Sequence, residues 1–505
     1  MHRTKRLTDL LDAIGPAGGA GAASVAGADA IVVTGISEDS RTVEPGFLFV
    51  AIDGTTRDGA DFASDAVARG AVAVVAERSL PLGVPAVVVP DARRALAGLA
   101  AAFYDAPTEA LRVVGVTGTN GKTTVCHWIA HLLGPARTEL VGTVANEARG
   151  LSAVTTPASP IVQRIAREAV DAGREHLVIE ASSIGLAQGR LDAVSFDVVA
   201  FTNLGEDHAD LHADREAYLA AKAGLFRRLG PDGRGVVNAD DPQHAAIAAA
   251  CCGRTFTVGR RRGVDLRATD VEPSLDRVRF VLESGGGSAR VDLPAAGVGR
   301  VENALVAAGV GLCAGLDLTR IAARLRTVPD VPGRWTVFRD DAGTTAIIDF
   351  AHNPDALARA LEALQGVYNR IVAVFGAPGG TDRAKRERMG EVAGRAADVT
   401  VLTNDNPKDE APGAILDELA SGVRRAGGRF ETCVDRAEAI GRAVTTAGAG
   451  GVVLVAGKGH ERYQIVRGDL IPYADGAVLA RLGFRPIGAA SESSRAGRTN
   501  RRENG

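Results

Sequence analysis

Hydrophobic residues in the middle of the chain gather in short continuous runs, with polar turns and helical patterns between them. The runs are LRVVGV at 111–116, HLVIEA at 176–181, DVVAFTNL at 197–204 and GRGVVNAD at 233–240. Strands that are buried on both faces give runs of this kind. Because the runs alternate with helical patterns, they predict a parallel sheet with crossover helices, and hence an α/β fold.

The same rhythm returns towards both ends of the chain. Pro107 follows a short helical pattern, and TVPDVPGRW at 327–335 carries two prolines and a glycine, so we place domain boundaries at these points. We expect three α/β domains, at 1–108, 109–330 and 331–490, and a polar, disordered tail at 491–505. The strands predicted for the outer domains are IVVTGI at 31–36, FLFVAI at 47–52, AVAVVAE at 71–77, TTAIIDFA at 344–351, RIVAVFGA at 370–377, DVTVLTND at 398–405 and GVVLVAGKG at 451–459.

Composition narrows the class of protein. A chain of 505 residues suits about three domains of ~100–200 residues each. The formal net charge of −3 gives no case for nucleic acid or an anionic membrane as a partner. The five cysteines are scattered, without metal-site spacing, which favours reduced thiols in the cytoplasm. No secretory signal follows the basic N-terminus, and no apolar run reaches the ~20 residues of a membrane span.

The sharpest local signal is GVTGTNGKTT at 115–124, which follows a predicted strand and precedes a predicted helix. Glycines in such a loop let backbone amides turn towards phosphates, and the helix N-terminus adds partial positive charge. Lys122 would reach the outer phosphates of a nucleotide, and the Thr123 hydroxyl would bind Mg²⁺. The spacing departs from the strict phosphate-loop motif, because Val116 stands at the position of the first glycine. An ordinary glycine-rich turn is the alternative interpretation.

Two further groups follow predicted strands of the same domain. Glu180 ends HLVIE, and His208 follows TNLGED after the next strand. Ligands bind beyond the carboxyl ends of strands in open α/β sheets, and Mg²⁺ prefers a few oxygen donors. Glu180 and His208 are therefore candidate magnesium ligands, although each alone is more often a solvated or hydrogen-bonded side chain. Lys222 lies in a helical stretch, where the default interpretation is a surface lysine.

Taken together, these segments resemble the Mur ligase family, in the type that adds the third residue of the peptidoglycan stem peptide. The resemblance covers about residues 30–485. The motifs that carry it, in the family's order, are D39SRTVEPGFLFVAIDG54, GTNGKTT, TTP at 155–157, EASS, FDVVAFTNL, YLAAK, VVNADD, PGR, DFAHNPDAL, DNPK and AGKGHERYQ. It implies a uridine-binding domain, a central phosphate-loop domain with a parallel sheet, and a Rossmann-like C-terminal domain.

The resemblance also implies an ATP-dependent ligase that activates a carboxylate as an acyl phosphate. Cofactors would be ATP and two Mg²⁺ ions, with CO₂ bound as a carbamate on Lys222. Lys122, Glu180, His208 and Lys222 would be catalytic, and Thr123, Glu180, His208 and Lys222 would serve the metal. The residues implied for ATP are Gly118, Thr119, Asn120, Gly121, Lys122, Thr123, Thr124, Asn303, Arg334, Asp349 and His352. Those implied for a UDP-sugar peptide are Ser40, Thr155, Thr156, Ser182 and Arg190. Those implied for the amino acid are Arg383, Asp405, Asn406, Lys408, Gly457 and Glu461.

Four departures from the family pattern affect the substrate side. Ile184 stands where this type has histidine, Gly299 and Arg300 interrupt the usual glycine–phenylalanine–asparagine segment, and Lys408 replaces an arginine. The loop at 376–390 is irregular: without gaps, Thr381 takes the position of an arginine that contacts the amino acid, and a one-residue shift gives that role to Arg383. A lysine offers a point charge where arginine grips a carboxylate with two bonds, so the change at Lys408 is not conservative.

Three functions remain open at this point. The protein adds a diamino acid to UDP-N-acetylmuramoyl-L-Ala-D-Glu for the cell wall, or it is a paralogue that joins an amino acid to another carboxylate in a specialised pathway. The third is a nucleotide-binding regulator without catalysis, which the joint presence of Lys122, Glu180, His208 and Lys222 disfavours. We expect a cytoplasmic monomer acting on small molecules. Neither the amino acid nor the acceptor follows from the residues alone.

Overall fold

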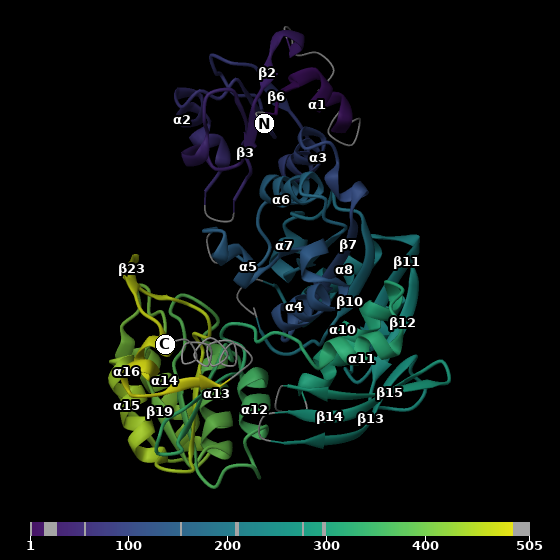
Figure 1. Cartoon of the computed structure of the whole chain (residues 1–505). Coiled ribbons are helices and arrows are strands. Elements are labelled where there is room, and N and C mark those ends of the chain that lie inside the picture. Colours follow the sequence, from purple (N-terminus) through teal and green to yellow (C-terminus); the bar gives the residue numbers. More distant parts are fainter. Residues whose placement is uncertain are drawn as a thin grey trace, which may run out of the picture.

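The computed structural model describes residues 3–14, 28–54, 57–151, 154–207, 212–274, 277–294 and 299–487. Its strands form three principal sheets, of four, nine and seven strands, which follow one another along the chain. Figure 1 shows the N-terminal sheet at the top, the nine-stranded sheet below it, and the C-terminal sheet at the lower left. The expected α/β class and mostly parallel central sheet are confirmed. The expected tail at 491–505 lies outside the described residues.

The N-terminal region is a small parallel sheet in the order β3-β4-β5-β6. One side is covered by α1 and α3, whose leucines pack with the valines of the strands. A separate pair, β1 and β2, lies beside it. The elements are β1 (Lys5–Arg6), α1 (Leu7–Ile14), β2 (Val32–Val33), β3 (Gly35–Ser37), β4 (Phe47–Val50), α2 (Ala63–Ala68), β5 (Ala73–Ala76), β6 (Ala86–Val88) and α3 (Ala92–Phe103).

The central region is built on the order β15-β14-β13-β12-β11-β10-β7-β9-β8. Strands from β8 to β13 are parallel, and β13, β14 and β15 form an antiparallel extension. The elements are β7 (Arg112–Thr117), α4 (Lys122–Leu133), β8 (Thr138–Val141), α5 (Thr143–Ala148), α6 (Ser159–Asp171), β9 (His176–Glu180), α7 (Ser183–Ala187), β10 (Phe196–Phe201), α8 (Arg215–Arg227), β11 (Leu229–Asn238), α9 (His244–Ala249), β12 (Arg254–Gly259), β13 (Leu266–Pro273), β14 (Val278–Ser284), β15 (Gly287–Leu293), α10 (Gly299–Cys313) and α11 (Leu318–Leu325).

Both faces of this sheet are buried, which explains its continuous hydrophobic runs. Helices α4, α10 and α11 pack on one face, and α6 and α8 on the other. Successive side chains of β7 alternate between these two cores: Val114 and Val116 face one, and Val113 faces the other. The strand order places β7 between β9 and β10, so the polar segments that follow these three strands meet at one edge.

The C-terminal region has the order β20-β19-β18-β21-β17-β16-β24, with helices on both faces. Strands β20 to β17 are parallel, and β16 and β24 add an antiparallel edge. The elements are β16 (Thr336–Arg339), β17 (Thr345–Asp349), α12 (Pro354–Glu362), β18 (Ile371–Phe375), α13 (Ala384–Ala396), β19 (Val399–Leu402), α14 (Pro412–Arg425), β20 (Phe430–Thr432), α15 (Arg436–Ala447), β21 (Val452–Ala456), β22 (Tyr463–Val466), β23 (Asp469–Pro472), α16 (Asp475–Arg481) and β24 (Arg485–Ile487).

Among the described residues, no helix combines the length and the apolar character that a membrane crossing requires.

Candidate active site

The glycine-rich loop joins β7 to α4, as the sequence predicts. Gly118 and Gly121 have φ angles of +145° and +86°, which side chains rarely adopt. A Cβ atom on Gly118 would lie 1.9 Å from the Thr202 hydroxyl oxygen, so glycine is also needed for space. Lys122 begins α4, and its Nζ donates to the carbonyl oxygens of Gly118 and Thr119 at 3.0 and 2.9 Å. The loop therefore combines backbone amides, a helix N-terminus and a lysine, as a phosphate site requires.

Glu180 lies beside this loop at the end of β9 and is buried. The Thr123 hydroxyl donates to its Oε1 at 2.9 Å, and the amide and hydroxyl of Thr143 donate to its Oε2 at 3.0 and 3.2 Å. A hydroxyl and a carboxylate next to a phosphate loop are oxygen donors that suit Mg²⁺. The described part of the chain contains no cluster of three or more histidine, cysteine or acidic residues that could hold a metal ion. His208 lies outside the described residues.

Lys222 is buried on α8 and points at the same loop. Its Nζ donates to the Gly118 carbonyl oxygen at 2.7 Å and lies 4.1 Å from the centre of the Tyr218 ring. No carboxylate forms an ion pair with it among the described residues. Burial, helped by the charge of Lys122, holds the pKa of Lys222 well below its ordinary value. The surface-lysine interpretation is therefore wrong, because the side chain is buried.

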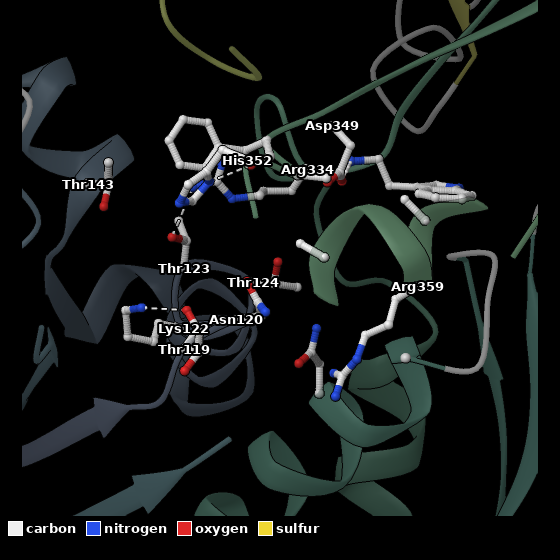
Figure 2. A pocket seen from close by; sticks show the side chains of 18 of the residues that line it. Thr119, Asn120, Lys122, Thr123, Thr124, Thr143, Arg334, Asp349, His352 and Arg359 are labelled. Carbon is white, nitrogen blue, oxygen red and sulfur yellow. Dashed lines mark hydrogen bonds between the residues drawn. The ribbon is translucent and has the colours of Figure 1, made fainter. Parts of the chain in front are cut away.

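The C-terminal region supplies the opposite wall of the site (Figure 2). Arg334 reaches across and donates to the Thr123 hydroxyl at 3.3 Å, while its guanidinium lies 4.1 Å from the centre of the Phe350 ring. Asp349, at the end of β17, accepts a hydrogen bond from the Trp335 amide at 2.8 Å. Burial raises the pKa of Asp349, against the effect of the neighbouring arginines.

A cavity of about 340 Å³ lies between these two walls. The predicted nucleotide residues Thr119, Asn120, Gly121, Lys122, Thr123, Thr124, Asn303, Arg334, Asp349 and His352 all line it. Gly118 does not line it but lies behind it, under the Lys122 and Lys222 amines. Glu180 and Glu461 are also part of the lining, so the cavity extends from the phosphate loop to the C-terminal strand ends.

Polar contacts hold the two walls together. Asn353 is fully buried, and its side-chain nitrogen donates to the side-chain oxygens of Asn120 and Asp207 at 3.1 and 3.3 Å. Asp207 also lies 3.4 Å from the His352 Nε2 and 3.7 Å from the Lys385 Nζ. The polar segment after β10 is thus joined to α12 and α13 of the C-terminal region.

A second polar cluster lies at the ends of β19 and β21. The buried Lys458 Nζ donates to the Glu461 carboxylate at 2.7 Å and to the Asn406 side-chain oxygen at 3.1 Å, and it lies 3.6 Å from Asp405. Asn406 in turn donates to Glu461 at 2.9 Å. A Cβ atom on Gly457 would lie 2.7 Å from the Asp405 carboxylate. Four of the six residues predicted to bind the amino acid therefore lie in this cluster, around Lys458, which was not among the predicted site residues.

Lys408 lies next to this cluster, in a strained backbone conformation. Its φ is +52°, and its amide and carbonyl are tied to Ile465 and Arg467 by hydrogen bonds of 3.0 and 2.8 Å. The backbone conformation therefore fixes the direction in which the half-exposed Lys408 side chain points away from the main chain.

Comparison with known proteins decides the family. The model described as the Mur ligase middle domain matches residues 116–311, "Mur ligase, glutamate ligase domain" matches 333–459, and "Mur ligase family, catalytic domain" matches 32–104. Over 458 residues the chain is 42% identical to the UDP-N-acetylmuramoyl-L-alanyl-D-glutamate–2,6-diaminopimelate ligase of Geobacillus thermodenitrificans, covering 88% of this chain and 94% of that protein. The chain belongs to the Mur ligase family.

Solved structures agree with this assignment. A structure of a UDP-N-acetylmuramoyl-L-alanyl-D-glutamate–2,6-diaminopimelate ligase matches with a TM-score of 0.63 and 32% identity, covering 91% of this chain and 96% of that one. MurF from Acinetobacter baumannii shares the fold, with a TM-score of 0.65 and 22% identity over 89% of this chain and 93% of its own. As a Mur ligase, the protein is an ATP-dependent enzyme that forms carbon–nitrogen bonds between small molecules, and membership implies the use of ATP and Mg²⁺.

The residues predicted to hold the UDP-sugar peptide fall into two places in this Mur ligase. Thr155, Thr156 and Ser182 lie next to Glu180: the Thr156 hydroxyl donates to the Glu180 carbonyl oxygen at 2.7 Å and lies 3.0 Å from the Ser182 hydroxyl. Arg190 donates to the Thr156 carbonyl oxygen at 2.6 Å. Ser40 is buried in the N-terminal region.

Arg190 lies within electrostatic range of Glu38, near the Ser40 turn. Burial raises the pKa of Glu38, and its own backbone hydrogen bond and the charge of Arg190 act against this rise. Thr155, Thr156, Ser182 and Arg190 thus lie together in the central region, whereas Ser40 lies in the N-terminal region.

Arg383 is placed apart from the other residues expected to bind the amino acid. Its exposed side chain forms an ion pair with Glu418 of α14, and no bond joins it to the Lys458 cluster among the described residues. Arg386 takes the buried position instead, with ion pairs of 2.9 Å to Glu410 and Glu418 and a bond of 3.0 Å to the Pro378 carbonyl oxygen. The one-residue shift that would give Arg383 a binding role therefore finds no support in its contacts.

Sequence reasoning missed several side chains of this Mur ligase site. Arg300 lies 3.8 Å from Asp349 and lines the cavity, although it was noted only as a departure from the family pattern. Asn353 and Lys458 stand inside quoted motifs, DFAHNPDAL and AGKGHERYQ, and their polar character within buried segments was an available signal. Asp207 and Lys385 come from separate segments, and only the fold brings them together.

Proposed function

We propose that this Mur ligase joins 2,6-diaminopimelate to UDP-N-acetylmuramoyl-L-alanyl-D-glutamate, converting ATP to ADP and phosphate. The observation that carries the proposal is that Lys122 of the phosphate loop and Glu461 of the Lys458 cluster line the same cavity. The relatives at 42% and 43% identity, both named as diaminopimelate ligases, support the choice of substrates. We further propose that the enzyme acts as a monomer in the cytoplasm, within three domains near 1–108, 109–330 and 331–490.

The nucleotide lies across the cavity in this proposal. Lys122 and the loop amides bind the outer phosphates, and Arg334 approaches the same phosphates from the opposite wall. Asp349 accepts a hydrogen bond from the ribose, and Asn303 and His352 complete the nucleotide's surroundings. Desolvation of the half-buried Lys122 lowers its pKa, and an anionic phosphate nearby would stabilise its charged form.

Magnesium fits the oxygen donors beside the loop. Thr123 and Glu180 offer a hydroxyl and a carboxylate 2.9 Å apart, and they would bind one ion between them. When bound, Mg²⁺ neutralises the charge that develops on the transferred phosphoryl group. The second ion and the part played by His208 stay predictions.

Lys222 suits the proposed carbamate for a chemical reason. Its lowered pKa favours the neutral amine, which is the form that attacks CO₂. The ammonium would lose one proton to give this amine, and N–C bond formation would release a second, so a cationic side chain would become an anionic oxygen donor next to Gly118. A carbamate at this position would also end the repulsion between Lys222 and Lys122.

The two substrates approach from opposite sides. Thr155, Thr156, Ser182 and Arg190 bind the peptide of the acceptor, and Ser40 binds towards the uridine. Asp405, Asn406, Gly457 and Glu461 hold the amino acid, with Lys408 directed at its distal carboxylate. Lys458 offsets the negative charge of Asp405 and Glu461, so the carboxylates can face an ammonium group without repelling each other.

The reaction then proceeds in two displacements. An oxygen of the acceptor carboxylate attacks the γ-phosphorus of ATP, the bond to ADP breaks, and an acyl phosphate forms. The neutral amine of the amino acid attacks the acyl carbon, phosphate leaves with the bonding electron pair, and the proton that the nitrogen loses passes to the departing phosphate. Contacts such as Asn353–Asn120 keep the walls closed and exclude water, which would otherwise hydrolyse the acyl phosphate.

Mass spectrometry of the products tests this proposal. The purified protein with ATP, Mg²⁺, the UDP-dipeptide and diaminopimelate should yield the UDP-tripeptide and ADP in a ratio of one to one. Product from another amino acid, with none from diaminopimelate, would contradict the substrate assignment. Absence of any acceptor-dependent ADP would contradict the ligase chemistry in this chain.

A further inference from the structure

A second cavity lies at the opposite end of the central sheet from the phosphate loop. Its volume is about 310 Å³, and it opens at the start of β7 and β9, beside the end of α4 and the side of α11. Its lining is unusually basic: Arg112, Arg137, His176, Arg320 and Arg324, with Glu175 as the one acidic residue, and Leu133, Ala314 and Leu316 as the apolar part.

The arginines of this basic cavity have few anionic partners. Arg137 pairs with Glu175, its Nε donating at 2.6 Å. Among the described residues, the side chain of Arg112 bonds only to the Ala314 carbonyl oxygen, at 3.2 Å, and that of Arg324 only to the Leu132 carbonyl oxygen. Arg320 makes no side-chain bond within the described ranges. Four arginines less one glutamate give the described lining residues a formal charge of +3.

His176 lines the cavity as well, and its buried Nδ1 has no hydrogen-bond partner in the described part of the chain. The arginines repel one another: after burial, the charges of Arg320 and Arg137 lower the pKa of Arg324. A bound anion would relieve this repulsion.

We propose that this basic cavity is a binding site for a small anion with two or more phosphate groups. The arginines come from β7, from the turn at Pro135–Arg137 and from α11, so a compact ligand would bridge three segments of the chain. Guanidinium groups grip phosphate oxygens with paired hydrogen bonds, which favours phosphates over monovalent ions. The six residues of β7 place this site about 20 Å from the phosphate loop, so it is separate from the nucleotide site.

The site is nevertheless connected to the nucleotide site by continuous elements. Strand β7 begins at Arg112 and ends at the phosphate loop, and β9 begins at His176 and ends at Glu180. Helix α4 begins at Lys122, and the Leu132 carbonyl near its end accepts the bond from Arg324. Binding of an anion therefore involves the far ends of the three elements that carry the proposed catalytic groups. The proposal for the basic cavity does not depend on which substrates the enzyme joins.

Calorimetric titration with inorganic pyrophosphate tests the proposal. The Lys122→Ala protein should serve as the reference, because it weakens binding at the phosphate loop and leaves the basic cavity intact. Pyrophosphate should bind this protein at 0.15 M NaCl, and Arg320→Ala added to it should weaken binding about fivefold or more. Arg320 is suited to the test because its side chain makes no bond with another described residue, so its loss should not unfold the region. Arg320→Glu should remove binding.

The matched control is Arg326→Ala, at the end of the same helix but outside the cavity lining. It should leave pyrophosphate binding unchanged, as should replacing chloride by another monovalent anion at equal ionic strength. No binding in the Lys122→Ala protein would overturn the proposal. So would equal weakening by Arg320→Ala and Arg326→Ala, because that result would indicate only a general effect of surface charge.

Discussion

Asn353, at the start of α12, donates a hydrogen bond to the side-chain oxygen of Asn120 in the phosphate loop at 3.1 Å. The two residues lie 233 positions apart in the chain; Asn120 lines the nucleotide cavity, and Asn353 follows His352, which lines it from the C-terminal region. A local bond orients Asn353: its side-chain oxygen accepts a hydrogen bond from the Ala356 amide at 2.9 Å and so caps α12. The contact therefore links the closure of the C-terminal domain directly to the phosphate loop.

Loss of this contact should uncouple the reaction. In Asn353→Ala we expect peptide formation to fall about tenfold, since a buried hydrogen bond contributes up to ~1.5 kcal/mol. Phosphate release should fall less, because a less tightly closed site lets water reach the acyl phosphate. The ratio of phosphate released to peptide formed measures this directly. Asn369→Ala, in an exposed loop of the same domain, should keep the ratio at one.

Replacement of Lys222 by alanine should reduce turnover by about a hundredfold or more, because the carbamate's oxygen donor is lost. Millimolar formate or acetate should restore part of the activity to this variant by entering the space of the carbamate. The measurement is the rate of phosphate release with and without the carboxylate, with the wild-type protein as control. Full activity in Lys222→Ala would remove the carbamate from the mechanism.

Lys222 should also give the unmodified protein a particular pH dependence. Because its pKa is lowered in the folded state, the unfolded chain binds more protons between that pKa and the ordinary lysine value. The contribution of Lys222 to the free energy of unfolding should thus be least favourable at pH values below its pKa in the folded protein, and it should become more favourable as the pH rises. In CO₂-free buffer, wild type should gain about 1.4 kcal/mol per pH unit relative to Lys222→Met within that window.

Urea unfolding of both proteins at several pH values, followed by Trp128 fluorescence in the central domain, gives this difference. Parallel pH profiles of the two proteins would show that Lys222 keeps its proton when folded. Added bicarbonate should stabilise wild type and leave Lys222→Met unaffected.

Lys408→Arg should strengthen the use of diaminopimelate, because arginine grips a carboxylate with two bonds. The left-handed backbone at this position is held by bonds to Ile465 and Arg467, which the substitution leaves in place. We expect the KM for diaminopimelate to fall about threefold to tenfold. Lysine, which lacks the distal carboxylate, should show no change and serves as the control substrate. An unchanged KM for every amino acid would mean that Lys408 does not touch the substrate.

The strands were predictable where both faces are buried. The runs LRVVGV and HLVIEA match β7 and β9 to within about one residue, because strands buried on both faces need continuous hydrophobic runs. Short or half-polar strands such as β8, with the sequence TELV, were not predicted. They acquire their structure from pairing with β9, and a local pattern does not contain that pairing.

The parts of the candidate site that local sequence motifs determine could be predicted from the sequence. The loop at 118–124 carries its own turn chemistry, so its shape follows from the sequence. Arg383 precedes α13 and is exposed, whereas Arg386 lies within its first turn and is buried, a difference that the sequence alone does not show. Similarly, the burial of Lys222 and the bond from Asn353 to Asn120 require the fold, because their partners are distant in the chain.

The central claim is that the enzyme couples ATP cleavage to the addition of diaminopimelate to a UDP-dipeptide. Phosphate release should be measured with ATP, Mg²⁺ and UDP-N-acetylmuramoyl-L-alanyl-D-glutamate across a panel of amino acids. The account predicts rapid release with diaminopimelate, slow release with lysine, and almost none without the UDP-dipeptide. Release that is independent of the UDP-dipeptide, or silence across the whole panel in a protein that still binds ATP, would contradict it.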